Sequence, residues 1–171
     1  MRILRLIALL ICAISPGGAW ASDASIRIGF LLNFTRFTEW PESVLQPNMP
    51  ITICLAPGDA EMSAEFSSLD RQTVKNRAVR AIQITRPSEV ARCQVLYLPA
   101  DLGQGPLAWL TAAELAGALT VSDRQNFVAQ GGIIGLVLVA GRYVFDANLA
   151  QAKRANLFLS ANLLKLAQTV K

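Results

Sequence analysis

The chain after its first 21 residues opens with apolar positions at helical spacing. Residues 26–40 are expected to form a helix, and Pro41 is expected to end it because proline cannot continue a helix. The apolar stripe of this helix consists of Ile26, Phe30, Phe34, Phe37 and Trp40. Since each aromatic ring buries a large apolar area, we expect the stripe to pack on a sheet rather than to stack a ligand.

Short apolar runs then alternate with helical segments through the middle of the chain. This pattern predicts strands at residues 51–55, 77–85, 94–100 and 118–123, and helices starting near Asp59 and spanning 88–92 and 106–117. A repeated order of strand, turn and helix is typical of an α/β protein with parallel strands.

The next two strands are joined in a different way. Gly131 and Gly132 precede an apolar strand at residues 133–139, and a three-residue turn leads into a second strand at 143–145. Strands joined by so short a turn are antiparallel. The chain is therefore expected to be a single α/β domain whose mixed, mostly parallel sheet ends in a late antiparallel hairpin, with helices on both faces.

The C-terminal segment, residues 144–167, is predicted to be a strand that leads into one long helix. Asp146 or Asn148 is expected to cap that helix by accepting hydrogen bonds from its free N–H groups. The helix carries two apolar stripes, which indicates two neighbours. Either both neighbours lie inside the domain, or the second stripe meets another protein.

The first 21 residues have the pattern of a secretory signal peptide. They combine two arginines, an apolar run and an Ala-Trp-Ala ending, so we expect cleavage after Ala21 and a mature domain at residues 22–171. Removal of Arg2 and Arg5 lowers the formal charge from +4 to +2, with 14 basic and 12 acidic residues left. Because no dense basic run remains, nucleic-acid binding is not expected.

The composition excludes most catalytic chemistry. The chain has no histidine, which excludes a histidine triad and a histidine-ligated metal. The acidic residues are scattered singly along the sequence, without the clustered pair that general acid–base catalysis needs. We therefore expect a protein that is not an enzyme and that holds no metal or cofactor.

Four segments together resemble one protein family. They are "FLLNFTRFTEWP", "ITICLAPGD", "TVSDRQNFVAQGGIIGLVL" and "RYVFDANLAQAKRANLFLSANLLKLA", in this order. They resemble the YfiR-like periplasmic proteins over nearly the whole mature chain. The well-known members carry a second cysteine pair near the Gly-rich strand, whereas this chain has no cysteine there.

The resemblance implies a periplasmic, non-enzymatic repressor. Members of the family are α/β domains that bind the periplasmic part of an inner-membrane diguanylate cyclase and so control cyclic-di-GMP and biofilm formation. The expected partners are that cyclase or a sensor kinase, an OmpA-like outer-membrane lipoprotein that relieves repression, and a second copy of the chain in a homodimer. The alternative is a small-molecule binding module that feeds a sensor kinase or a transport system, with its pocket near Pro57, Asp59 and Asp101.

The resemblance also implies two sets of site residues. The expected partner-binding residues lie at the junction of the last strand and helix: Phe145, Asp146, Asn148, Ala152, Arg154 and Leu157. Cys54 and Cys93 match a cysteine pair of the family, and two thiols in an oxidising compartment can form a disulfide.

Simple parallel register argues against that disulfide, because it would place the two cysteines on the order of 10 Å apart, beyond the ~7 Å limit between Cα atoms. An offset register or a bend would remove this conflict. Two buried free thiols are the alternative.

Overall fold

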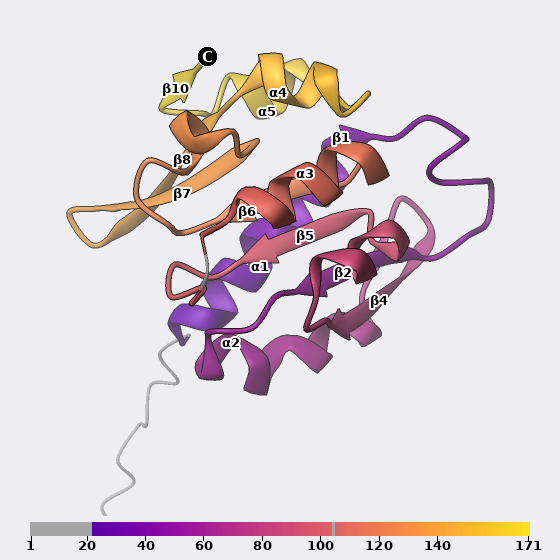
Figure 1. Cartoon of the computed structure of the whole chain (residues 1–171), viewed down its shortest axis with the longest axis horizontal. Coiled ribbons are helices and arrows are strands. Elements are labelled where there is room, and N and C mark those ends of the chain that lie inside the picture. Colours follow the sequence, from indigo (N-terminus) through magenta and orange to yellow (C-terminus); the bar gives the residue numbers. More distant parts are fainter. Residues whose placement is uncertain (1–21, 104) are drawn as a thin grey trace, which may run out of the picture.

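The computed structural model describes residues 22–103 and 105–171, and an eight-stranded sheet forms its centre. The strand order in this sheet is β10-β8-β7-β6-β5-β2-β4-β3, and β1 and β9 form a separate two-stranded pair (Figure 1). The strands are β1 (Thr38–Glu39), β2 (Ile51–Leu55), β3 (Thr73–Val74), β4 (Arg77–Gln83), β5 (Val95–Leu98), β6 (Leu119–Ser122), β7 (Ile134–Val139), β8 (Arg142–Ala147), β9 (Phe158–Leu159) and β10 (Thr169–Val170). The α-helices are α1 (Asp23–Arg36), α2 (Ala60–Glu65), α3 (Leu107–Ala116), α4 (Leu149–Arg154) and α5 (Ala161–Leu164), and the 3-10 helices are η1 (Phe66–Arg71), η2 (Pro87–Arg92) and η3 (Phe127–Gln130).

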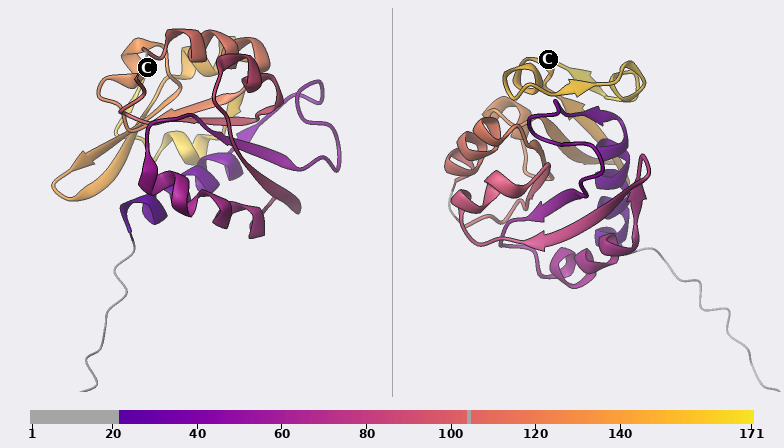
Figure 2. Two further views of the ribbon diagram at one scale, coloured as in Figure 1. Left: turned by 60° about the horizontal axis from the view of Figure 1, so that its bottom comes forward. Right: turned by 90° about the vertical axis from the view of Figure 1, so that its right-hand side faces the viewer.

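The mixed sheet confirms the predicted fold class. Neighbouring strands from β4 through β2, β5 and β6 to β7 are parallel, whereas β7 and β8 form the antiparallel hairpin. Side chains alternate between two cores: Ile53 belongs to the core with α1 and α2, and Cys54 to the core with η2 and α3. Helices therefore cover both faces of the sheet, as Figure 2 shows for α1 and α3.

The buried face of α1 differs from the predicted stripe. Ala24, Ile28, Leu31 and Phe34 face the core, whereas Ile26 is 41% exposed. The other aromatic residues of the predicted stripe pack only at the margin of this core. Because α1 carries apolar residues on most of its circumference, spacing alone did not fix which row packs on the sheet.

The prediction of one long C-terminal helix is wrong. α4 stops at Arg154, and Asn156 takes a left-handed backbone conformation (φ +55°) that ends the helix. The chain then forms β9, which pairs antiparallel with β1, and Ser160 caps the short helix α5. β10 finally returns to lie parallel beside β8. Pairing of β9 with β1 therefore competes successfully with helix continuation.

Candidate functional site

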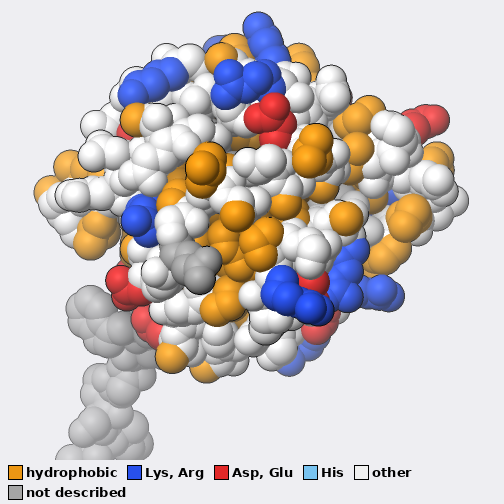
Figure 3. Space-filling view, in the orientation of Figure 1, with side chains coloured by type: hydrophobic (Ala, Val, Ile, Leu, Met, Phe, Trp, Pro, Cys, Tyr) orange, Lys and Arg blue, Asp and Glu red, His pale blue; other side chains and the backbone are white. Residues whose placement is uncertain are grey.

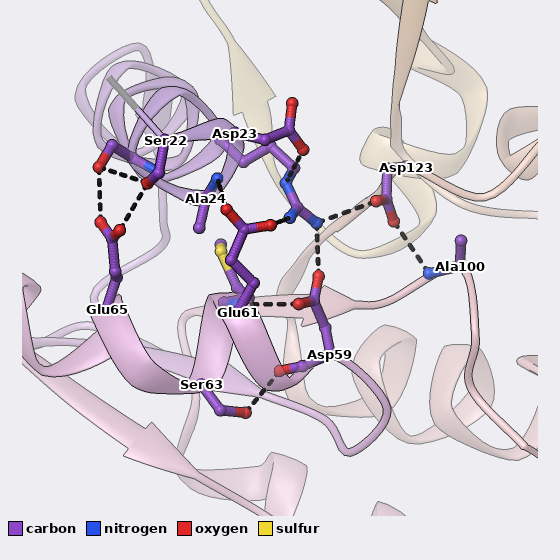
Figure 4. Close-up of polar contacts among 12 residues, drawn as sticks. Ser22, Asp23, Ala24, Asp59, Glu61, Ser63, Glu65, Ala100 and Asp123 are labelled. Carbon is purple, nitrogen blue, oxygen red and sulfur yellow. Dashed lines mark hydrogen bonds and ion pairs between the residues drawn. The ribbon is translucent and has the colours of Figure 1, made fainter. Parts of the chain in front are cut away.

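A buried arginine collects acidic side chains at the carboxyl ends of the central strands. Arg27 on α1 is only 4% exposed. It meets Asp59 after β2, Tyr97 on β5 and Asp123 after β6, with Asp23 one helical turn earlier and Glu61 on α2. Parallel strands bring their carboxyl ends to one edge, which explains why residues so far apart in sequence gather here. Figure 4 shows Asp23, Asp59, Glu61 and Asp123 pointing toward one another.

The distances describe a network of ion pairs and hydrogen bonds around Arg27. Its Nη1 lies 2.5 Å from Asp59 Oδ2 and 3.0 Å from both Asp123 Oδ2 and the Tyr97 hydroxyl. Its Nη2 lies 3.6 Å from Glu61 Oε2. Its Nε lies 3.1 Å from Asp23 Oδ2 but makes no hydrogen bond, so this contact is an ion pair without good donor geometry.

The surroundings of Arg27 and Tyr97 hold the protons of these two side chains in place. Burial disfavours the charged form of Arg27, but the contacts with Tyr97 and Asp59 outweigh it, and the net effect raises the pKa of Arg27. Burial, followed by the charge of Asp123, raises the pKa of the Tyr97 hydroxyl. General acid–base catalysis needs a group that titrates near the working pH, and neither of these does. Arg27 is therefore a fixed cation whose ion pairs tie α1 to the strand ends.

Sequence reasoning missed this site. The acidic residues are scattered along the sequence, but the fold gathers four of them around Arg27, so the expectation that no acids cluster is wrong. A usable signal was present, because Asp59 and Asp123 each follow shortly after a parallel strand. Arg27 itself gave no signal, since it lies between Ile26 and Ile28 in an apolar helix.

The six predicted partner-binding residues lie in different environments. Phe145, Ala152 and Leu157 are core residues with at most 5% exposure, and the Phe145 ring packs edge-on against Phe34 at 5.0 Å. Asn148 caps α4 through its bond from the Gln151 amide. Among the six, the surface residues are Arg154, which is exposed, and the partly exposed Asp146 and Asn148.

The cysteines form a disulfide. Cys54 and Cys93 are both buried, and their Cα atoms lie 5.8 Å apart. Ile53 pairs with Val95, so a straight extension of β5 would place Cys93 opposite Ile51. Instead, η2 ends just before Cys93, so the chain bends as it enters β5. This bend brings Cys93 within disulfide distance of Cys54, and it is one of the two geometries that the sequence allowed.

A cavity also lies at the strand ends where a small-molecule pocket was expected. It encloses about 370 Å³ and is lined by Pro57, Arg86, Leu102 and Trp109, among others. Asp59 and Asp101 do not line it, and Asp59 belongs to the Arg27 network.

Within residues 22–103 and 105–171, no helix is long and apolar enough to cross a membrane. The same residues contain no group of three or more side chains placed to hold a metal ion. The predicted signal peptide lies outside the described residues.

The chain is similar to one known protein family and to a solved structure. Residues 24–168 match the YfiR/HmsC-like family. No curated protein matches the chain. A crystal structure of a conserved domain protein from Vibrio cholerae O1 biovar eltor is similar to this one, with a TM-score of 0.57 and 13% sequence identity. The match covers 88% of this chain and 60% of that one, so this chain spans less than two thirds of the solved chain, and the likeness concerns the fold alone.

Proposed function

This chain belongs to the YfiR/HmsC-like family of periplasmic regulators of diguanylate cyclases, and on that premise we propose that it represses such a cyclase. It acts in the periplasm, after removal of residues 1–21, by binding the periplasmic part of the inner-membrane enzyme. Repression is relieved when an OmpA-like lipoprotein of the outer membrane sequesters the repressor. The observation that carries this proposal is the family match over residues 24–168.

The chemistry of the domain is consistent with a binding role. The family is one of regulators rather than catalysts. The most prominent polar cluster of the described residues is closed around Arg27, whose charge is already paired with carboxylates. A protein of this kind acts through its surface.

The proposed contact surface runs from the end of β8 along α4 to the residues that follow it. Of the residues expected there, Arg154 is the exposed one, and its Nε lies 3.8 Å from Glu114 Oε2, a weak and solvent-exposed pair. The buried residues Phe145, Ala152 and Leu157 support this surface from below by packing. Replacement of Arg154 changes the surface charge and also removes its hydrogen bond to the Gln151 side chain, so the folded state of the variant is checked by circular dichroism.

The experiment that tests the function combines deletion with a charge reversal. Deletion of the gene is expected to raise cellular cyclic-di-GMP. Reintroduction of the wild-type gene is expected to lower cyclic-di-GMP to its original level. Arg154→Glu is expected to reduce recovery of the cyclase's periplasmic domain in pull-downs. Lys165→Glu, an exposed lysine near the C-terminal end of the chain, is the matched control. Unchanged cyclic-di-GMP after deletion contradicts the function, whereas equal recovery with Arg154→Glu contradicts only the assigned surface.

A second candidate function has one observation in its favour. The cavity of about 370 Å³ beside Trp109 and Arg86 has the size and mixed lining of a small-molecule site. In this role the chain is a small-molecule binding module that feeds a sensor kinase or a transport system. A thermal-shift screen with nucleotides, amino acids and peptidoglycan fragments tests this candidate, and Trp109→Ala is expected to abolish any shift that depends on the cavity.

A further inference from the structure

A cleft is lined by η3, by residues 123–126 before it and by the β7–β8 hairpin. It encloses about 550 Å³. Residues 123–126 form its polar rim, and the side chains of Val128 and Val137 contribute an apolar wall. Figure 3 shows hydrophobic side chains at the margin of the molecule where Figure 1 places the hairpin. The cleft is separate from the cavity at the strand ends, with which it shares no lining residue.

Asp146 lines this cleft and is incompletely satisfied. Its Oδ1 atom is buried and has no hydrogen-bond partner among the described residues. Gly135 lies directly opposite on β7 and offers no side-chain donor to the carboxylate, and Val128 of η3 packs over this glycine. No lysine or arginine of the described chain forms an ion pair with Asp146.

The neighbouring polar groups are already engaged. Asn148, on the same face of the strand, donates to the Val128 carbonyl and accepts from the Gln151 amide. Asp123 is paired with Arg27 and accepts from the Ala100 amide. Arg124 donates to the Ala100 carbonyl.

Lys171 is the remaining charged residue in the lining, and it forms no ion pair with Asp146. A buried carboxylate oxygen without a donor is costly, and folded proteins keep few such atoms, often where a ligand or ion completes them.

We propose that this cleft binds an alkyl-guanidinium or alkyl-ammonium group. A carboxylate oxygen only accepts hydrogen bonds, so its partner must be a donor, and a cationic donor forms the strongest such bond. Val137, which lies on the same face of the hairpin as Asp146, and Val128 of η3 form an apolar wall that suits the methylene stem that carries the cation in arginine, lysine and simple amines. The charged head thus pairs with Asp146, and the stem lies along the hairpin.

The first test uses two ligands of the same shape and different charge. Butylguanidinium carries the cation, and butylurea is its neutral counterpart. In amide NMR titrations of the mature protein, butylguanidinium is expected to cause saturable shifts at Gly135 and Asp146, with a Kd of about 1–10 mM for so small a ligand. Butylurea is expected to bind at least about tenfold more weakly. Equal binding of both ligands, or no saturable shift with butylguanidinium, overturns the proposal.

A pair of variants sharpens this result. Asp146→Asn is expected to weaken butylguanidinium binding at least about tenfold, because it removes the charge and keeps the shape. Asp101→Asn, an exposed acid outside the cleft, is the matched control and is expected to change nothing. Equal affinity of wild type and Asp146→Asn overturns the proposal. If Asp146→Asn does not fold, the comparison of butylguanidinium with butylurea on wild-type protein still tests whether the cleft selects a cation.

The cation can come from a protein side chain or from a free amine, and a competition experiment separates these sources. Arginine blocked at both ends as an acetyl methylamide represents a protein side chain, and agmatine represents a free amine. Tighter competition by blocked arginine assigns the site to a bound protein, and tighter competition by agmatine assigns it to a small amine. Failure of both to displace butylguanidinium overturns the proposal.

Discussion

The Arg27 network surrounds its cation with carboxylates, whereas the β7–β8 hairpin leaves a carboxylate without a cation among the described residues. Each side-chain nitrogen of Arg27 lies within 3.6 Å of a carboxylate oxygen, and the network joins α1 to the ends of three strands. In the hairpin, Leu138 is 59% exposed, and one oxygen of Asp146 has no partner among the described residues. β7 pairs with β6 only at Ile134 and Gly135, so the hairpin extends beyond the sheet. The network ties elements of the fold together by charge, whereas the hairpin leaves its carboxylate without a cation in the part of the chain that the structure describes.

The largest expected effect comes from breaking the network. Arg27→Met leaves several carboxylates close together without their cation, and we expect a loss of about 3–5 kcal/mol in the free energy of unfolding. Urea denaturation followed by circular dichroism measures this loss. Arg92→Ala breaks only the exposed pair with Glu89 and is expected to cost less than about 0.5 kcal/mol. Equal effects of the two variants would show that the network does not stabilise the fold.

Removal of the disulfide is expected to have the next largest effect. The double variant Cys54→Ala with Cys93→Ala opens a loop between residues that are 39 apart in sequence. We expect a loss of about 2–4 kcal/mol in the free energy of unfolding, mainly because the unfolded chain gains freedom. Thiol counting on denatured, unreduced wild-type protein is expected to find no reactive thiol at these positions, and two would contradict the disulfide.

A smaller effect concerns the pH response beside the network. Hydrogen bonds from Ser22 and Ser25 lower the pKa of Glu65 below its ordinary value of 4.5. A lowered pKa in the folded state means that this carboxylate stabilises the fold above its unfolded pKa and loses that contribution as the pH falls through the folded value. Ser25→Ala is expected to raise the pKa of Glu65 toward 4.5, as measured by carboxyl NMR titration. Ser88→Ala, at an exposed serine, is expected to leave it unchanged.

The smallest expected effect lies in the hairpin. Leu138→Ser is expected to change the free energy of unfolding by no more than about 0.5 kcal/mol, because the side chain is already largely in water. Leu136, two residues earlier on the same strand, is 2% exposed, and Leu136→Ala is expected to cost about 2–4 kcal/mol. Thermal and urea unfolding of both variants measure the contrast. A large loss with Leu138→Ser would mean that the hairpin is part of the core.

Local signals predicted most of the fold. The strand at residues 51–55 was found without error, because an apolar run is bounded by turn residues. The short turn before Arg142 likewise predicted the antiparallel hairpin. The prediction of one long C-terminal helix failed because residues of that segment form β9, which pairs with β1 more than a hundred residues earlier. Helical spacing in the sequence does not report a partner that lies so far away.

The candidate sites were predicted less well, for the same physical reason. The Arg27 network depends on which strand ends meet, and the surroundings of Asp146 depend on Gly135 opposite it and on η3. Neither relation is visible in local periodicity. The cysteine pair was identified by resemblance, but only the bend before Cys93 explains how the two residues meet.

The pairing of Thr38 with Leu159 sets the order in which the molecule can be completed. Because synthesis starts at the amino end, β1 is made long before β9. The pair of β1 and β9 therefore cannot form until the last residues have been added. Contacts this distant in sequence slow folding, and they prolong the time during which apolar surface is open to chaperones and proteases. A chain cut short before Phe158 would lack both β9 and the buried Leu163, and quality control would meet it as an unfinished domain.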